Sequence, residues 1–174
     1  MSGHYRMFAA YNAWANRLVY EAVGRLDEAD FRKDLGAFFG SLHGTLNHLL
    51  AADRIWMRRF TGAGDAPNRL DAILHEDFAG LAAARATEDA RIAGWIDTLD
   101  ADRLAAEFTY RPITGAGTAV THALRPALDH LFNHQTHHRG QCHAMLTMVG
   151  GPSLSLDLIY FLRTDGTAFL RAAE

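Results

Sequence analysis

Five of the chain's ten histidines lie in one segment, residues 130–146, with the sequence HLFNHQTHHRGQCHAML. Its first ten positions contain no glycine or proline, which favours a helix. Neutral imidazoles are common ligands of transition metals, and two of them one helical turn apart can reach the same ion. The first question is therefore which of these histidines face a common point.

A helical wheel separates the five histidines. At about 100° per residue, His138 lies within roughly 30° of the centre of the apolar stripe, and His134 within roughly 70°. His130 and His137 fall beyond roughly 100°, and His143 lies on the opposite side. We predict that His134 and His138 face the interior together, with His130 and His137 beside the site or on the surface. The stripe itself consists of Leu124, Leu128, Leu131, Cys142, Leu146 and Val149.

Two imidazoles do not complete a catalytic metal site, which usually has about three protein ligands. Helical bundles supply further ligands from facing helices. His48, in LNHLLAADRIW, is the best third candidate, although the wheel places it at the edge of its apolar face. His43 is predicted to point away from that face. The remaining candidates, His4, His75 and His122, lie near helix starts or in loops.

Other polar residues fall on inward-facing positions. Asp53 lies in the middle of an apolar face, where it would either orient a ligand histidine or pair with an arginine such as Arg17 or Arg139. Gln141 lies near the inward flank and could cap a polar pocket. Cys142 is predicted to be a small buried hydrophobic residue rather than a ligand.

Long helices must position these residues. Ser41 is a predicted N-cap, and residues 108–122 are predicted to form a loop or a small irregular hairpin with a turn at 115–117. Four long amphipathic helices predict an all-α four-helix bundle, which we expect to be a single domain over residues 1–174. Apolar residues at helical spacing predict helices at 4–24, 27–33, 42–61, 72–99, 121–149 and 155–163.

The composition narrows the possible partners. The 174 residues carry a formal net charge of -3 and no basic stripe, so no nucleic-acid partner is expected. No apolar stretch of 18 residues or signal-like segment occurs, and the single cysteine excludes an internal disulfide, so we expect a cytoplasmic protein without a membrane partner. Met7, Phe8 and Val19 are predicted to be exposed apolar residues on the first helix, which favours a homodimer.

Four segments together resemble the DinB-like family (DinB/YfiT-type), a group of metal-dependent four-helix-bundle proteins. They are YNAWANRL, LNHLLAADRIW, HLFNHQTHHRGQCHAML and SLDLIYFLR, and they occur in the family's order over nearly the whole chain. The HxxxHRGQ part is the most specific of them. The chain does not depart from the family's histidine pattern.

The resemblance implies an up-down-down-up bundle with a crossover connection and a short C-terminal helix. It implies three metal ligands, His48, His134 and His138, around a divalent ion, usually nickel or zinc. Imidazole ligands by themselves also suit iron or copper. The resemblance further implies homodimers, and reactions that transfer or isomerise a small-molecule substrate with a low-molecular-weight thiol.

Three functional hypotheses remain open. An enzyme, with metal-dependent S-transferase or hydrolase-like chemistry, would hold a thiol at the metal, and Arg139 or the 108–118 loop would contact an acidic group of the substrate. A non-catalytic stress or sensor module would bind metal or a ligand without turnover. In the third hypothesis the histidines form a surface cluster, and metal binding is incidental.

Overall fold

The computed structural model describes residues 2–113 and 117–170. Over these residues the chain is mainly helical, which confirms the predicted all-α fold class. The long helices are α1 (Ser2–Val23), α3 (Leu42–Thr61), α4 (Phe78–Asp97) and α6 (Leu124–Met148). The short elements are α2 (Glu28–Arg32), α5 (Ala101–Ala105), β1 (Glu107–Tyr110), β2 (Val120–Ala123), α7 (Leu158–Arg163) and the 3-10 helix η1 (Thr167–Phe169).

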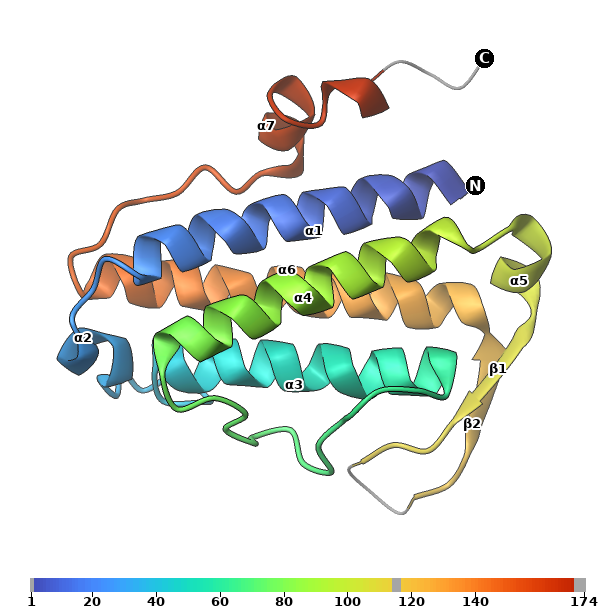
Figure 1. Ribbon diagram of the computed structural model, residues 1–174, viewed down its shortest axis with the longest axis horizontal. Coiled ribbons are helices and arrows are strands. Elements are labelled where there is room, and N and C mark those ends of the chain that lie inside the picture. The colour runs from blue at the N-terminus through green and yellow to red at the C-terminus, as the bar shows by residue number, and fades with distance from the viewer. Residues whose placement is uncertain (1, 114–116, 171–174) are drawn as a thin grey trace.

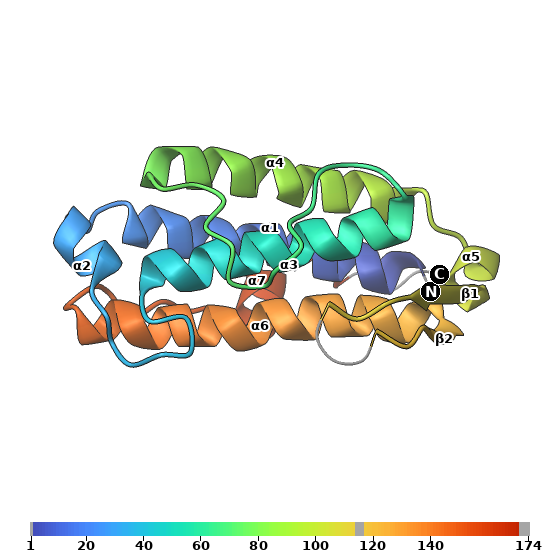
Figure 2. The ribbon, with the colours of Figure 1, turned by 90° about the horizontal axis from the view of Figure 1, so that it is seen from below.

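The four long helices form an up-down-down-up bundle. Helices α1 and α6 run in one direction, and α3 and α4 run in the other (Figure 1). Helices α1 and α3 each pack against both α4 and α6, so α4 and α6 lie at opposite corners of the bundle (Figure 2). Because α3 and α4 are parallel, residues 62–77 must return along the bundle. This segment is the crossover that the resemblance implies.

The helix boundaries agree with the prediction for α3 and shift for the later helices. Ser41 caps α3 by accepting a hydrogen bond from the Gly44 amide at 3.1 Å. Helix α4 begins at Phe78 rather than at 72, because Asp77 is its cap and the residues before it belong to the crossover. The predicted starts at 121 and 155 are also too early: α6 begins at 124 and α7 at 158.

Residues 108–122 were predicted to form either a loop or a small irregular hairpin, and the structure contains a hairpin over residues 107–123. Strands β1 and β2 pair antiparallel, from Glu107 opposite Ala123 to Tyr110 opposite Val120. The predicted turn at 115–117 lies partly outside the described residues. Helix α6 follows β2 directly, and the Leu124 amide donates to the Ala106 carbonyl at 3.0 Å. The hairpin therefore anchors the start of the histidine-bearing helix at one end of the bundle (Figure 1).

The apolar stripe predicted for α6 is buried, apart from the half-buried Val149. Burying a large aliphatic side chain contributes roughly 1.5–3 kcal/mol, so this stripe fixes the rotation of α6 about its axis. The rotation in turn decides which histidines face inward. The buried members of the stripe are at most 4% exposed: Leu124, Leu128, Leu131, Cys142 and Leu146.

A buried ion-pair chain links α3 to α4. Asp53 of α3 is fully buried, and its carboxylate lies 2.8 Å from the Arg85 guanidinium of α4. Arg85 also pairs with Asp89 at 2.9 Å. The predicted partners of Asp53, Arg17 and Arg139, are therefore wrong. The wheel of α3 shows that Asp53 faces inward but cannot show which helix carries the opposite charge.

Arg139 has a structural role. It is 2% exposed, and its guanidinium donates to the amide oxygens of Asn12 at 2.5 Å and Asn16 at 3.1 Å. Its predicted contact with a substrate is wrong, because these partners hold it between α6 and α1. Burial lowers the pKa of Arg139. Arg17, by contrast, is exposed and pairs with surface carboxylates.

The outer face of α1 differs from the prediction. Val19 is 1% exposed and belongs to the core, and Phe8 stacks on Phe132 with ring centres 5.7 Å apart. These residues do not form the expected exposed apolar patch, and the homodimer stays a prediction. No described helix has the length and apolar character needed to cross a membrane.

Candidate metal centre

Three histidines from two helices converge in the middle of the bundle. The Nε2 atom of His48 in α3 lies 3.1 Å from Nε2 of His134 and 3.2 Å from Nε2 of His138, both in α6. One ligand atom from each ring lies within 4.8 Å of the other two. The helical wheel placed His48 at the edge of the apolar face of α3. In the structure it is 2% exposed and therefore lies inside the helix interface. The structure thus brings the three predicted residues together.

The hydrogen-bond partner of His48 defines its tautomer. Its Nδ1 atom lies 2.7 Å from the carbonyl oxygen of Leu70, in the crossover. A carbonyl oxygen only accepts hydrogen bonds, so Nδ1 carries the hydrogen and donates it. The Nε2 atom of the neutral ring is then left with an unshared electron pair, directed at His134 and His138.

His138 is oriented in the same way by a side chain on its own helix. Its Nδ1 atom lies 2.7 Å from the amide oxygen of Gln141, which can only accept. Nε2 of His138 therefore also directs an electron pair toward His48. Gln141 was predicted to lie near the inward flank of α6 and to cap a polar pocket. In the structure it orients the ring of His138.

Burial keeps the three rings neutral at physiological pH. It lowers the pKa of His48 to about 4, partly opposed by the Leu70 hydrogen bond, and that of His134 to about 3. It also lowers the pKa of His138. Two electron pairs that face each other at 3.2 Å repel unless a cation lies between them. The donor set therefore fits a metal ion.

The spacing and ligand type both suit a first-row transition metal. Zn–N bonds of about 2.0–2.1 Å in tetrahedral geometry place neighbouring nitrogens about 3.3 Å apart, close to the observed separations. Imidazole nitrogens favour zinc, nickel, iron or copper over magnesium and calcium, which prefer oxygen. The three histidines could accordingly hold one such ion.

Phe39 covers one side of the cluster. It lies in the segment between α2 and α3, and its ring stacks on His48 with the centres 3.8 Å apart and an angle of 18°. The same ring meets the edge of His138 at 5.6 Å. No sequence pattern pointed to Phe39, because it lies in a loop and not at a periodic position. It shields the cluster from water on this side.

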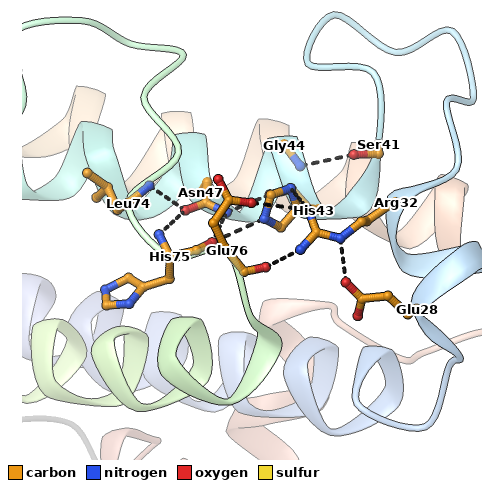
Figure 3. Close-up of polar contacts among 9 residues, drawn as sticks. All are labelled: Glu28, Arg32, Ser41, His43, Gly44, Asn47, Leu74, His75 and Glu76. Carbon is orange, nitrogen blue, oxygen red and sulfur yellow. Dashed lines mark hydrogen bonds and ion pairs between the residues drawn. The ribbon is translucent and has the colours of Figure 1, made fainter.

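Asn47 fixes the crossover that carries Leu70. Its amide oxygen accepts hydrogen bonds from the backbone amides of Leu74 at 2.8 Å and His75 at 3.0 Å (Figure 3). Its amide nitrogen donates to the carbonyls of His43 at 3.0 Å and His75 at 3.1 Å. The only sign of this role in the sequence is that an asparagine directly precedes His48.

His43 is not part of the cluster and helps to hold the crossover. It is 6% exposed, and its Nε2 atom lies 3.1 Å from the His75 carbonyl. Arg32 of α2 contacts the other nitrogen of this ring and bonds to both Glu28 and Glu76 (Figure 3). His43 points toward a loop that a wheel of α3 alone does not include.

A cavity of about 260 Å³ opens beside His134. His134 is half-buried and lines it together with His130, an exposed residue whose ring centre lies 5.6 Å from that of His134. His130 was predicted to lie either beside the site or on the surface, and the structure places it beside the site. The other walls are Ala52, Ile55, Trp56 and Arg59 of α3, Leu70 of the crossover, and Tyr110, Pro112 and Ile113 of the hairpin region.

The remaining candidates contribute no ligand atom to the cluster. His137 is exposed, although its ring lies beside that of His138 with the centres 4.7 Å apart, and His143 accepts a hydrogen bond from the Leu154 amide at 2.9 Å. Cys142 is fully buried among apolar side chains, and burial raises the pKa of its thiol to about 12. As predicted, it is a buried hydrophobic residue. A larger cavity of about 830 Å³ lies between α1 and α4, and none of the three converging histidines lines it.

The fold and the cluster define a class of protein: a four-helix bundle with a three-histidine group, built on α3 and α6, that could hold a metal ion. The chain belongs to the DinB family, whose sequence model matches residues 1–168 of the 174. A comparison with curated proteins finds no match.

Proposed function

We propose that the protein binds one divalent transition-metal ion through His48, His134 and His138, with zinc or nickel favoured over iron or copper. The observation that carries this proposal is the pair of Nε2 atoms of His48 and His138, 3.2 Å apart, each with its hydrogen on the opposite nitrogen. A bound cation satisfies both electron pairs. Ordinary hydrogen bonding between the two rings would need one of these hydrogens to move.

We further propose that the site acts on a small-molecule substrate as a thiol-using transferase or isomerase. A divalent ion bound there would supply Lewis-acid chemistry and lower the pKa of a thiol. The cavity beside His134 provides room for the second reactant, while Phe39 stacks on His48 and does not line this cavity. Burial and the charge of Arg59 lower the pKa of His130, so this ring is a neutral proton acceptor at the cavity wall.

Metal analysis tests the first part of the proposal. Protein purified without an affinity tag or added metal should contain one ion per chain, and His48→Ala and His138→Ala should each lose it. His137→Ala is the matched control, because this exposed residue adjoins His138 but lies outside the cluster. Retention of the ion by His138→Ala would contradict the ligand assignment.

Turnover tests the second part. The zinc- and nickel-loaded protein is offered glutathione, coenzyme A and cysteine with an electrophile such as a chlorinated dinitrobenzene. We expect thioether formation that disappears in His138→Ala and persists in His137→Ala. Loaded protein that is inactive with every thiol would reject the enzyme and favour the alternative below.

The alternative function is a non-catalytic metal sensor. It is favoured by the contacts of His48 with two surface segments, through the Leu70 carbonyl of the crossover and the stacked ring of Phe39. If His48 moved on metal binding, its contacts with Leu70 and Phe39 would change, and both segments would shift with it. The sensor predicts slower proteolysis of both loops on metal loading, without turnover.

A further inference from the structure

The cavity beside His134 has one charged side chain among its walls. Arg59 of α3 provides a guanidinium, whereas the other wall residues are apolar or aromatic side chains and the imidazoles of His130 and His134. The charge balance of the cavity is therefore positive. No described carboxylate lies within ion-pair distance of Arg59.

The guanidinium of Arg59 is held in one orientation. Its central carbon lies 4.5 Å from the ring centre of Trp56 and 4.9 Å from that of Tyr110. One of its amino groups donates to the carbonyl of Arg111 at 2.9 Å. Cation–π contacts on two rings and this hydrogen bond fix the plane of the group, and other N–H donors remain for a ligand.

A preorganised guanidinium without a carboxylate partner is suited to bind an anion. Its fork of N–H donors matches the two oxygens of a carboxylate, and such charge-assisted hydrogen bonds are strong where water is partly excluded. A phosphate would carry more charge than the single arginine neutralises. The charge of the cavity therefore fits a monocarboxylate better.

The remaining walls suit an apolar ligand body. Ile55, Trp56, Leu70, Pro112 and Ile113 present hydrocarbon and aromatic surface to the cavity. Its volume of about 260 Å³ lies below the range typical of drug-sized ligands. The volume and the lining residues together suit a small organic acid with a short aliphatic or aromatic part.

We propose that the cavity binds the carboxylate of a small organic acid through Arg59 and packs its apolar part against Trp56 and Ile55. The acid is then the second reactant at the neighbouring three-histidine centre, a role that rests on the proposed function. Arg59, and not the predicted Arg139, would then contact the acidic group of the substrate.

Binding of benzoate and its neutral analogue benzamide tests the inference. The wild-type protein is first treated with a chelator, because a carboxylate could otherwise bind to a metal ion directly. Titration calorimetry and tryptophan fluorescence, to which Trp56 at the cavity contributes, should report saturable benzoate binding. Benzamide should bind at least about tenfold more weakly because it lacks the charge-assisted hydrogen bonds. Arg59→Gln should bring benzoate down to the affinity of benzamide, and Arg59→Lys should restore part of the difference.

Arg58→Gln is the matched control. Arg58 is the preceding residue on α3, is exposed, and contacts only the Gly64 carbonyl, at 3.4 Å, in the described structure. It should bind benzoate like the wild type. Equal binding of benzoate and benzamide by the wild type would overturn the inference without any variant having to fold. Equal losses in Arg58→Gln and Arg59→Gln, or competition by inorganic phosphate as effective as benzoate, would also overturn it.

The metal assays separate this inference from the proposed function. A wild-type protein that holds no metal but binds benzoate through Arg59 would support the anion site and reject the metal centre. A protein that loses its ion in His138→Ala but does not discriminate benzoate from benzamide would support the metal centre and reject the anion site.

Discussion

The Nε2 atoms of His48 and His138 lie 3.2 Å apart, although the two residues are 90 positions apart and belong to different helices. Each ring is oriented from its other side, His48 by the Leu70 carbonyl and His138 by the Gln141 amide oxygen. The two electron pairs thus point at each other, and burial keeps both rings neutral by lowering their pKa values. This relationship means that the cluster could hold a cation, whereas a hydrogen bond between the two rings would need one of the Nδ1 hydrogens to move.

The stability of the metal-free protein should fall as pH decreases. The folded state holds the pKa of His48 at about 4 and that of His134 at about 3, against an ordinary value of 6.5. Between about pH 6.5 and 4 the unfolded chain therefore binds more protons than the folded chain. The contribution of these two rings to the free energy of unfolding is therefore complete only above about pH 6.5, and His134 should account for a loss on the order of 2 kcal/mol between pH 7 and pH 5.

Urea unfolding in the presence of a chelator measures this dependence. His134→Ala should lose less stability than the wild type between pH 7 and pH 5, whereas His137→Ala, which alters an exposed histidine, should follow the wild type. Parallel pH profiles for the wild type and His134→Ala would show that the cluster is not buried in its neutral form.

Asn47→Ala should release the crossover from α3. The substitution removes all four hydrogen bonds of a buried amide and leaves backbone groups of the crossover without partners, at a cost of about 2–3 kcal/mol. Because Leu70 is then less well held against His48, metal affinity should fall about 10- to 100-fold. Competition with a chromophoric chelator measures the affinity, and urea unfolding measures the stability.

Asn68→Ala is the control for this prediction, since Asn68 is an exposed asparagine in the same crossover. It should change neither quantity. If Asn47→Ala binds metal as tightly as Asn68→Ala does, the crossover does not position His48.

Phe39→Ala should expose the proposed metal centre to solvent. The ring that stacks on His48 is lost, which should reduce the free energy of unfolding by about 1–2 kcal/mol. Chelators should then remove the ion faster, as followed by stopped-flow absorbance. Phe38→Ala provides a neighbouring control, because Phe38 is 86% exposed and should affect neither stability nor release. Equal release rates in the two variants would mean that Phe39 does not shield the ion.

Arg85→Met should be among the most destabilising substitutions. It leaves the buried carboxylates of Asp53 and Asp89 without their shared partner, which typically costs about 3–5 kcal/mol. Arg17→Met removes only exposed ion pairs and should cost at most about 1 kcal/mol. Thermal and urea unfolding at pH 7 compare the two, and a similar small loss in both would show that the ion-pair chain contributes little.

The positions of the long helices and the inward face of α6 follow from local sequence periodicity. The 3.6-residue repeat of leucines placed the long helices, and the rotation of α6 followed from its own apolar stripe. That rotation separated His134 and His138 from His137 and His143 without knowledge of any other helix. These features were predictable because residues close in sequence determine them.

Other features depend on which helices become neighbours and on the path between them. The pairing of Asp53 with Arg85, the burial of Val19 and the inward placement of His48 required the arrangement of α1, α3, α4 and α6. The contact of Leu70 with His48 required the route of the crossover. The sequence by itself determined which face of each helix is apolar and which histidines share a turn. Only the tertiary structure decided which groups meet across helices, because such contacts depend on packing between distant segments.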